Sequence, residues 1–202
     1  MEKQKNEKVD TGWIEYYDKT RESAVPNMVI LASFLTKNKD NALDIGAGSL
    51  RDTRFLLDDG FKHVSVLDGN PLLQSEVDRI DEGEKITVHN ELFEKFNFPE
   101  NKYDLVISIL SLPFIKPEDF NGVFYKIKKS LKRDGVLCVT LAGKNQSNQI
   151  MTGGTRHDRK DVEDLLEGMK IVSIEEVNNI EKTVVGGKDV NVHRFNIVAR
   201  KL

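Results

Sequence analysis

Residues 41–48 read Asn-Ala-Leu-Asp-Ile-Gly-Ala-Gly, an apolar segment that runs into two glycines. We expect a strand over residues 42–45 and, after the glycine turn, a helix over residues 51–59. A second strand, expected over residues 63–67, leads directly into Asp68. Glycines lack the Cβ atoms that would keep a ligand from the backbone, and the start of a helix leaves N–H groups unpaired. The pattern therefore predicts a cradle for an adenosine-containing cofactor, with the Asp68 carboxylate at the ribose hydroxyls.

Strand and helix patterns alternate along most of the chain. Strands are expected at 42–45, 63–67, 85–88, 103–109, 135–141, 171–177 and 192–201, and helices at 26–35, 51–59, 72–80, 117–131 and 161–169. Such alternation gives a parallel sheet covered by helices. The last two strands flank a polar segment with Gly186 and Gly187, which is typical of an antiparallel pair. We therefore predict an α/β fold: a doubly wound, mostly parallel seven-stranded sheet with helices on both faces and a C-terminal antiparallel strand pair.

Length and composition are those of one globular domain. The chain has 202 residues, of which 39% are hydrophobic and 31% charged, and a net charge of −3. This balance offers no basic field for a long nucleic acid. Its single cysteine, Cys138, excludes an internal disulfide and fits a reducing compartment, and no apolar run reaches the roughly 18 residues of a membrane span. We expect one cytoplasmic domain over residues 1–202, monomeric or homodimeric, without nucleic-acid or membrane partners.

An aromatic cluster stands near the N-terminus. Trp13, Tyr16 and Tyr17 occur in an otherwise polar segment, within an N-terminal extension expected over residues 1–25. Two interpretations remain open. The rings pack as a staple against the domain, or they form a lid over a bound ligand.

The glycine pattern discriminates between adenosine cofactors. A dinucleotide site has a third glycine three residues after the second, where this chain has Arg51. Asp44 places a carboxylate inside the first strand, where burial demands a partner. The sheet also ends in a strand pair instead of a second nucleotide-binding half. A dehydrogenase that binds a nicotinamide dinucleotide is therefore disfavoured.

Residues 43–48, followed by Val66-Leu67-Asp68, resemble the signature of the class I S-adenosylmethionine-dependent methyltransferases. Further motifs resemble the tellurite-resistance-type subgroup of that class: Trp13 with Tyr16-Tyr17-Asp18, residues 46–53, residues 110–114, Gly186-Gly187-Lys188 and His193-Arg194-Phe195. The resemblance covers nearly the whole chain. It implies the Rossmann-like methyltransferase fold, S-adenosylmethionine as cofactor and methyl transfer as the reaction.

The resemblance assigns the methionine end of the cofactor to the first strand and its turn. Gly46, Ala47 and Gly48 would wrap the methionine and ribose moieties. Asp44 would anchor that end through backbone or water contacts. Arg51 would meet the cofactor carboxylate or remain a solvated residue in the first turn of a helix, and both interpretations stay open.

The resemblance assigns the adenosine end to the second strand and to the segments beside it. Asp68 would accept hydrogen bonds from both ribose hydroxyls, and its charge strengthens such bonds. Gly69 and Asn70 would border the adenine. The other implied contacts are Leu92 and Phe93 at the second adenine edge, and Ser108 and Ile109 at the methionine moiety.

Catalytic residues are less clearly marked. Methyl transfer from a sulfonium is an in-line displacement that needs alignment and exclusion of water, so no catalytic triad is required. His193 is the candidate general base for a hydroxyl or thiol acceptor, and Tyr17 is the second catalytic candidate. The alternative for His193 is a polar side chain on an outward strand position, and His157 is expected on a loop surface or at a helix cap. The histidines are scattered, so we expect no metal site.

The chain departs from the subgroup on the acceptor side. Gln146 and Asn148 stand where the subgroup tends to carry an Asp and a Trp, and of its two C-terminal histidines only His193 is present. We expect methyl transfer to a small-molecule acceptor. Two alternatives remain: methylation of RNA or protein, and a non-catalytic regulatory protein that binds S-adenosylmethionine.

Overall fold

The computed structural model describes residues 11–80, 83–147 and 152–202. Its elements are, in chain order, α1 (Thr11–Thr20), α2 (Asn27–Leu35), β1 (Asn41–Ile45), α3 (Arg51–Asp58), β2 (His63–Leu67), α4 (Leu73–Val77), η1 (Gly83–Lys85), β3 (Ile86–His89), β4 (Tyr103–Ser108), η2 (Leu112–Phe114), α5 (Pro117–Ser130), β5 (Leu131–Gly143), β6 (Arg156–His157), α6 (Arg159–Leu165), β7 (Met169–Lys182) and β8 (Asp189–Lys201).

The sheet has the strand order β3-β2-β1-β4-β5-β8-β7, with β6 paired to β5 off this path. It is parallel from β3 to β5 and antiparallel from β5 to β7, so the predicted fold is confirmed. The two-residue strand β6 was not expected. It pairs with Ala142 and Gly143 of β5. Its two residues, Arg156 and His157, are polar and show no strand pattern, so the sequence does not predict it.

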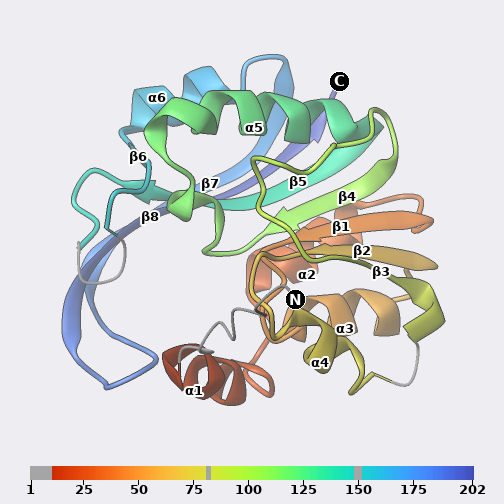
Figure 1. The fold of residues 1–202 in the computed structure, drawn as a ribbon. Helices are drawn as coiled ribbons and strands as arrows, with labels where there is room; N and C mark the ends of the chain where they lie inside the picture. The colour runs from red at the N-terminus through yellow and green to blue at the C-terminus, as the bar shows by residue number, and fades with distance from the viewer. Residues whose placement is uncertain (1–10, 81–82, 148–151) are drawn as a thin grey trace, which may run out of the picture.

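Two hydrophobic cores lie on opposite faces of the sheet. In Figure 1, α5 and α6 cover one face, and α2, α3 and α4 cover the other. Within β4, Val106 belongs to the core on the α5 side, whereas Leu105 and Ile107 belong to the core on the α2 side. Successive side chains of a strand point to opposite faces, so a strand covered on both sides is apolar throughout.

Helix boundaries depart from the expected ones by more than one residue in α4 and α6. α4 covers only Leu73–Val77 of the region predicted as helix. α6 begins at Arg159, two residues earlier than expected, because Asp158 caps it. The Asp158 carboxylate accepts the backbone N–H of Asp161 at 2.9 Å, and the Asp161 carboxylate accepts that of Asp158 at 2.8 Å, which satisfies both groups at the helix start.

Two polar contacts anchor the end of α1, the helix that carries the aromatic cluster. Thr20 Oγ1 lies 3.0 Å from Ser49 Oγ in the glycine turn. The Arg21 guanidinium, one residue after the helix, binds the two carboxylate oxygens of buried Glu76 at 2.9 and 2.8 Å. The first contact fixes α1 to the turn after β1 and the second fixes it to α4.

The strands β7 and β8 extend beyond the sheet as a hairpin arm. The pairing of β8 with β5 ends where Arg194 lies opposite Ala142, while β8 continues to pair with β7 over residues 178–182 and 189–193. In Figure 1 the arm curves towards α1, and there Lys19 Nζ donates to the carbonyl oxygen of Val184 at 3.2 Å. The prediction stops short of the outer end of the arm because residues 178–182 of β7 are mostly polar and lack the apolar alternation of a half-buried strand; in β8, Val190 and Val192 do alternate and are buried.

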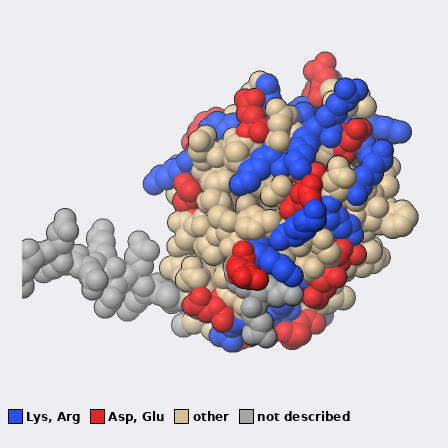
Figure 2. Space-filling model, turned by 90° about the vertical axis from the view of Figure 1, so that its right-hand side faces the viewer, with Lys and Arg blue, Asp and Glu red and all other residues tan. Residues whose placement is uncertain are grey.

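The surface carries charges of both signs. On the face drawn in Figure 2, lysine and arginine side chains are interspersed with aspartate and glutamate. Within the described ranges, none of the helices combines the length and the apolar character that crossing a membrane requires.

Candidate functional site

The carboxyl ends of β1, β2 and β4 meet at one edge of the sheet because these strands are parallel. Ile45 at the end of β1 pairs with Leu67 at the end of β2, and Ser108 ends β4. The residues that follow the first two strands, Gly46 and Asp68, are therefore brought together at this edge. Ligands of open α/β sheets bind at this edge, where the strand order reverses.

The turn after β1 requires glycine. Gly46 and Gly48 adopt positive φ angles of 70° and 53°, which side chains with a Cβ rarely tolerate. The Gly46 N–H donates to the carbonyl oxygen of Leu67 at 2.6 Å. A Cβ on Gly46 would overlap the side chain of Ser111. Backbone conformation and close packing therefore both demand glycine at position 46.

Asp68 faces this turn from the end of β2. Its Oδ2 accepts the backbone N–H of Gly48 at 2.9 Å, and its Oδ1 accepts that of Asn70 at 2.8 Å. Burial raises the pKa of Asp68, although these two hydrogen bonds oppose the rise. A carboxylate has about four acceptor positions, so about two remain. The half-buried Asp68 therefore keeps the capacity to accept two hydroxyl groups, as a ribose diol requires.

The loop after β3 closes against the turn after β2. The Asn90 side-chain amide donates to the carbonyl oxygens of Asp68 and Asn70, each at 2.8 Å. A Cβ on Gly69 would lie 2.9 Å from Leu92 Cδ2, and Leu92 is 54% exposed. The structure thus brings Gly69, Asn70 and Leu92 together, with an apolar side chain exposed beside Asp68.

Asp44 is buried within β1 and has a hydroxyl partner. Its carboxylate accepts the Thr53 hydroxyl at 2.7 Å. Burial, together with the nearby Asp52 carboxylate, raises the pKa of Asp44 to about 7. Arg51 is engaged within the protein: its guanidinium binds both carboxylate oxygens of Asp52, at 2.7 and 2.9 Å, and the Ser23 hydroxyl at 3.2 Å. A contact between Arg51 and a cofactor carboxylate stays a prediction.

Two serine hydroxyls occupy the end of β4. Ser108 Oγ and Ser111 Oγ lie 3.1 and 2.6 Å from the Ile45 carbonyl oxygen. Phe93 adds a ring on this side, because its Cζ lies 3.5 Å from the Cβ position of Gly46, and Ile109 is half-buried. Ser111 was not among the predicted site residues. Its only signal in the sequence is a hydroxyl within the motif at residues 110–114.

The Tyr17 ring covers Gly48. Tyr17 is 2% exposed, and a Cβ on Gly48 would lie 3.6 Å from its ring. Burial and the nearby carboxylates of Asp68 and Glu76 raise the pKa of Tyr17 well above its usual range. The phenol therefore keeps its proton near neutral pH, so a catalytic role for it is that of a hydrogen-bond donor. Trp13 is 42% exposed, so within the aromatic cluster Tyr17 is the ring packed on the turn.

His193 is buried, not on the outward strand position considered above. Its Nδ1 accepts the backbone N–H of Asn145 at 3.1 Å, and its Nε2 lies 3.0 Å from Glu176 Oε1. The ring packs on Gly143, where a Cβ would overlap it. The His193 backbone N–H donates to Gln146 Oε1 at 2.9 Å. Both ring nitrogens are engaged, and a role as general base stays a prediction.

The other position at which the chain departs from the subgroup, Asn148, lies outside the described residues. Within those residues, no group of three or more His, Cys, Asp or Glu side chains is arranged to hold a metal ion. The described site combines the glycine backbone, the carboxylates of Asp44 and Asp68, the hydroxyls of Ser108 and Ser111, and apolar side chains.

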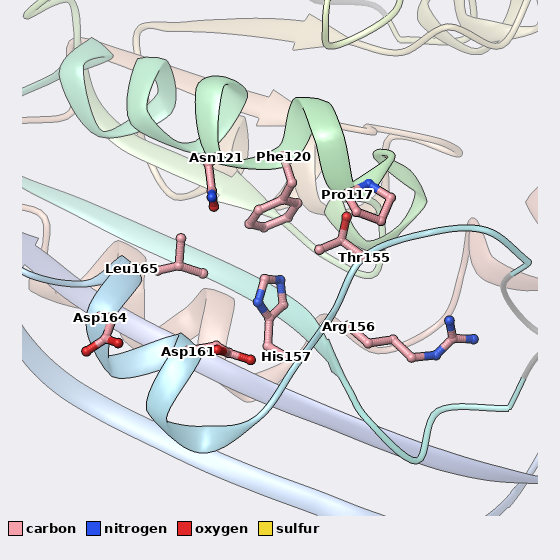
Figure 3. Close-up of a pocket in the computed structure, with 9 residues that line it drawn as sticks. All are labelled: Pro117, Phe120, Asn121, Thr155, Arg156, His157, Asp161, Asp164 and Leu165. Carbon is pink, nitrogen blue, oxygen red and sulfur yellow. The ribbon is translucent and has the colours of Figure 1, made fainter.

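A cavity of about 480 Å³ lies between α5, β6 and α6, apart from the glycine turn (Figure 3). His157 lines it. The expectation of a surface or capping position for His157 was wrong, because pairing of β6 with β5 places this residue inside: it is 6% exposed and its ring lies 4.7 Å from that of Phe120. Burial lowers the pKa of His157, which keeps the ring neutral.

Comparison with known proteins agrees with this architecture. Residues 42–135 match the family described as methyltransferase domain. None of the curated proteins compared with the chain matches it. The matched segment runs from β1 into the start of β5 and includes the glycine turn, Asp68 and the end of β4.

Several solved structures share the fold. TehB from Haemophilus influenzae aligns with a TM-score of 0.77 and 18% identity. The alignment covers 93% of this chain but only 66% of the TehB chain, just under two thirds. The 1,6-didemethyltoxoflavin-N1-methyltransferase of Burkholderia thailandensis, with S-adenosylhomocysteine bound, aligns with a TM-score of 0.69 and 18% identity. The alignment covers 95% of this chain and 86% of that chain. The N-methyltransferase NodS of Bradyrhizobium japonicum, also with S-adenosylhomocysteine bound, aligns with a TM-score of 0.68 and 15% identity. The alignment covers 94% of this chain and 98% of that chain.

Proposed function

We propose that the chain is a class I S-adenosylmethionine-dependent methyltransferase and that it transfers the methyl group to a small-molecule acceptor; the methyltransferase-domain match over residues 42–135 and the fold shared with solved methyltransferases support this proposal. The observation that carries the proposal is the pairing of the glycine turn with Asp68, whose carboxylate keeps about two acceptor positions free for a ribose diol. When bound, S-adenosylmethionine supplies an electrophilic methyl group on a sulfonium.

The residues proposed to hold the cofactor surround the edge formed by β1, β2 and β4. They are Asp44, Gly46, Ala47, Gly48 and Arg51 around the first turn, Asp68, Gly69 and Asn70 after β2, Leu92 and Phe93 after β3, and Ser108 and Ile109 at the end of β4. The positive φ angles of Gly46 and Gly48 set the course of the backbone along which the ligand would lie, while Ser111 and Tyr17 occupy the space beside their Cβ positions. The exposed Leu92 supports an apolar contact with the adenine.

The chain's own contribution to the reaction would be alignment and exclusion of water. Tyr17, buried on Gly48 and close to Asp68, is placed to form one wall of the site. Its protonated hydroxyl would donate a hydrogen bond. No proton transfer is required for a thiolate or oxyanion acceptor, because such a nucleophile already carries its electron pair.

Two observations support a small acceptor. The toxoflavin methyltransferase is described with its small-molecule substrate bound. The net charge of −3 gives no overall basic field of the kind that binds RNA, and on the face drawn in Figure 2 lysine and arginine are interspersed with aspartate and glutamate.

A second candidate function is regulatory binding of S-adenosylmethionine without catalysis. The engaged ring nitrogens of His193 favour it, because neither nitrogen can take a proton from an acceptor unless a hydrogen bond breaks. The raised pKa of Tyr17 also favours the regulatory function, because a phenol that keeps its proton cannot serve as a general base.

Two experiments test the proposal. In calorimetric titrations with S-adenosylmethionine, S-adenosylhomocysteine and NAD, we expect the first two to bind. Tight binding of NAD without binding of the sulfonium would overturn the cofactor assignment. In assays with labelled methyl groups on thiol, oxyanion, amine and RNA acceptors, transfer to a small acceptor is expected. Transfer to RNA alone would contradict it, and cofactor binding without any transfer would favour the regulatory function.

A further inference from the structure

Four hydrogen bonds tie the segment 145–147, which follows β5, to β8. The Asn145 N–H donates to His193 Nδ1 at 3.1 Å, and the His193 N–H donates to Gln146 Oε1 at 2.9 Å. The Ser147 N–H donates to the Asn191 carbonyl oxygen at 3.0 Å, and Asn191 Nδ2 donates to the Asn145 carbonyl oxygen at 2.6 Å. His193 is the one titratable side chain among these partners, so the proton content of its ring decides whether the first bond forms.

The hydrogen bonds fix the tautomer of His193. A neutral imidazole has one N–H and one acceptor nitrogen. Because Nδ1 accepts a backbone N–H, the ring proton lies on Nε2 and is donated to Glu176 Oε1 at 3.0 Å. The His193 side chain is 7% exposed and that of Glu176 40%. The ring cannot easily turn away, since it is packed on Gly143.

We propose that His193 is a proton-operated latch on the segment 145–147 and that Glu176 is the positioning residue that sets its tautomer. Protonation places a second N–H on Nδ1, opposite the Asn145 N–H, and two donors cannot share a hydrogen bond. The bond to Asn145 is then lost, while the bond to Glu176 becomes an ion pair that stabilises the charged ring. The other three hydrogen bonds do not involve the ring, so the segment is held by all four bonds when His193 is neutral and is loosened at Asn145 when it is charged.

The segment 145–147 follows the carboxyl end of β5, at the same edge of the sheet as the proposed site. Gly143 ends β5, and β5 is the parallel neighbour of β4, which ends at Ser108. The latch itself does not depend on methyl transfer, so its test is independent of the proposed function.

Glu176 is the charged side chain in contact with the His193 ring, and the other nearby charged groups bind elsewhere. Other charged or titratable side chains on the elements packed around His193 include Arg194 on β8, paired with Glu181 at 2.9 Å, Lys144 after β5, paired with Asp161 at 3.1 Å, Arg156 on β6, whose Nε donates to the Gln146 carbonyl oxygen at 3.3 Å, Glu175 on β7, which accepts from Asn196 Nδ2 at 3.0 Å, and His157 on β6, which lies opposite Gly143 and whose ring lies 4.7 Å from that of Phe120. Each of these contacts is made with a group other than the imidazole.

Nuclear magnetic resonance of the whole chain tests the latch. Nitrogen shifts of the imidazole report the tautomer, and hydrogen exchange reports protection of the Asn145 amide, with the Thr140 amide inside β5 as reference. As the pH is lowered, we expect the Nε2–H tautomer to give way to the charged ring. Protection of Asn145, corrected for the intrinsic exchange rate, should fall on the order of tenfold, while that of Thr140 stays constant.

Three variants separate the latch from a merely structural histidine. In His193→Asn, the side-chain oxygen accepts the Asn145 N–H but cannot titrate, so protection should persist at low pH. In Glu176→Gln, loss of the anion should move protonation of His193, and release of Asn145, to lower pH. Glu175→Gln, on the adjacent strand position, should leave both unchanged.

Three results would overturn the latch. They are an Nδ1–H tautomer at the alkaline end, constant protection of Asn145 while His193 titrates, and a pH dependence in His193→Asn equal to that of the native chain.

Discussion

Gly48 donates its backbone N–H to the carboxylate of Asp68 at 2.9 Å, across 20 residues of sequence. This contact joins the turn after β1 to the end of β2 and holds the carboxylate in place before any ligand arrives. The second backbone bond, from Asn70, fixes the other oxygen. A carboxylate held in this way loses little freedom when it accepts a ligand diol, which favours binding.

Replacement of Asp68 by Ala should weaken S-adenosylmethionine binding by roughly 1.5–3 kcal/mol, as expected when a charged acceptor is lost. Calorimetric titration measures this change. Asp68→Asn serves as the matched variant, because it retains one acceptor oxygen and should lose less. Unfolding by urea has to be followed in parallel, since both variants disturb the N–H groups of Gly48 and Asn70. An unchanged affinity in Asp68→Ala would place the ribose elsewhere.

Substitution of Gly46 by Ala should destabilise the fold by roughly 2–4 kcal/mol, because the positive φ angle is unfavourable for alanine and the new methyl group overlaps Ser111. Urea unfolding provides the measurement. Gly122→Ala is the control: this glycine lies in α5 with open space around it, so the change should stabilise by about 0.5–1 kcal/mol. A Gly46→Ala protein as stable as the native one would contradict the described turn.

Removal of the Arg21 side chain should loosen α1. Arg21→Ala leaves the Glu76 carboxylate, 5% exposed, without its two-pronged partner, at a cost of roughly 2–3 kcal/mol given that Arg21 itself is partly solvated. Arg79 contacts the same carboxylate at 3.5 Å but its side chain is 58% exposed, so Arg79→Ala should cost less than about 1 kcal/mol. Equal effects of the two variants on urea unfolding would show that Arg21 does not anchor the helix.

Asp44 should make the fold less stable as the pH rises. Its pKa in the folded chain, about 7 through burial and the nearby Asp52, lies above the unfolded value of about 3.9. Its contribution is therefore fully present below about pH 4 and is lost, by about 1.4 kcal/mol per pH unit, as the pH rises through the folded pKa. Asp44→Asn should remove this dependence, so the variant gains stability relative to the native chain between about pH 5 and pH 8.

The control for this comparison is Asp58→Asn in α3, at an exposed position. The pH dependence of its urea unfolding provides the baseline with which that of Asp44→Asn is compared. A stability difference between Asp44→Asn and the native chain that does not change with pH would contradict this prediction. The Asp44 carboxyl would then have to titrate as an ordinary surface group, contrary to its burial.

Local patterns predicted those parts of the fold whose hydrophobic residues face one partner surface. The strand predicted at residues 63–67 has the observed bounds of β2, and helix α2 ends at Leu35 as expected. The apolar run of β4 identified a strand covered on both faces before any helix was placed. The same patterns missed β6, whose two polar residues pair with β5, and residues 178–182 of the hairpin arm, which are mostly polar and pair with β8 across the hairpin turn.

The candidate site, like the fold, has residues that the sequence predicted and residues that it did not. The glycine turn and Asp68 were predicted because two adjacent parallel strands must end at the same edge of the sheet. Ser111, which fills the space that the missing Cβ of Gly46 leaves, gave no comparable signal. The buried positions of His157 and His193 also escaped prediction, since each depends on a strand pairing with β5.

By itself, the sequence determined a doubly wound sheet with a glycine turn and an acidic residue at adjacent strand ends, because hydrophobic periodicity and glycine conformation act over a few neighbouring residues. Only the tertiary structure decided that Tyr17 packs on Gly48, that Arg21 holds Glu76, and that His193 joins Glu176 to the segment after β5. These contacts join elements distant in the chain. Whether a polar side chain is buried, and which nitrogen of a histidine carries its proton, depends on what the fold places opposite it.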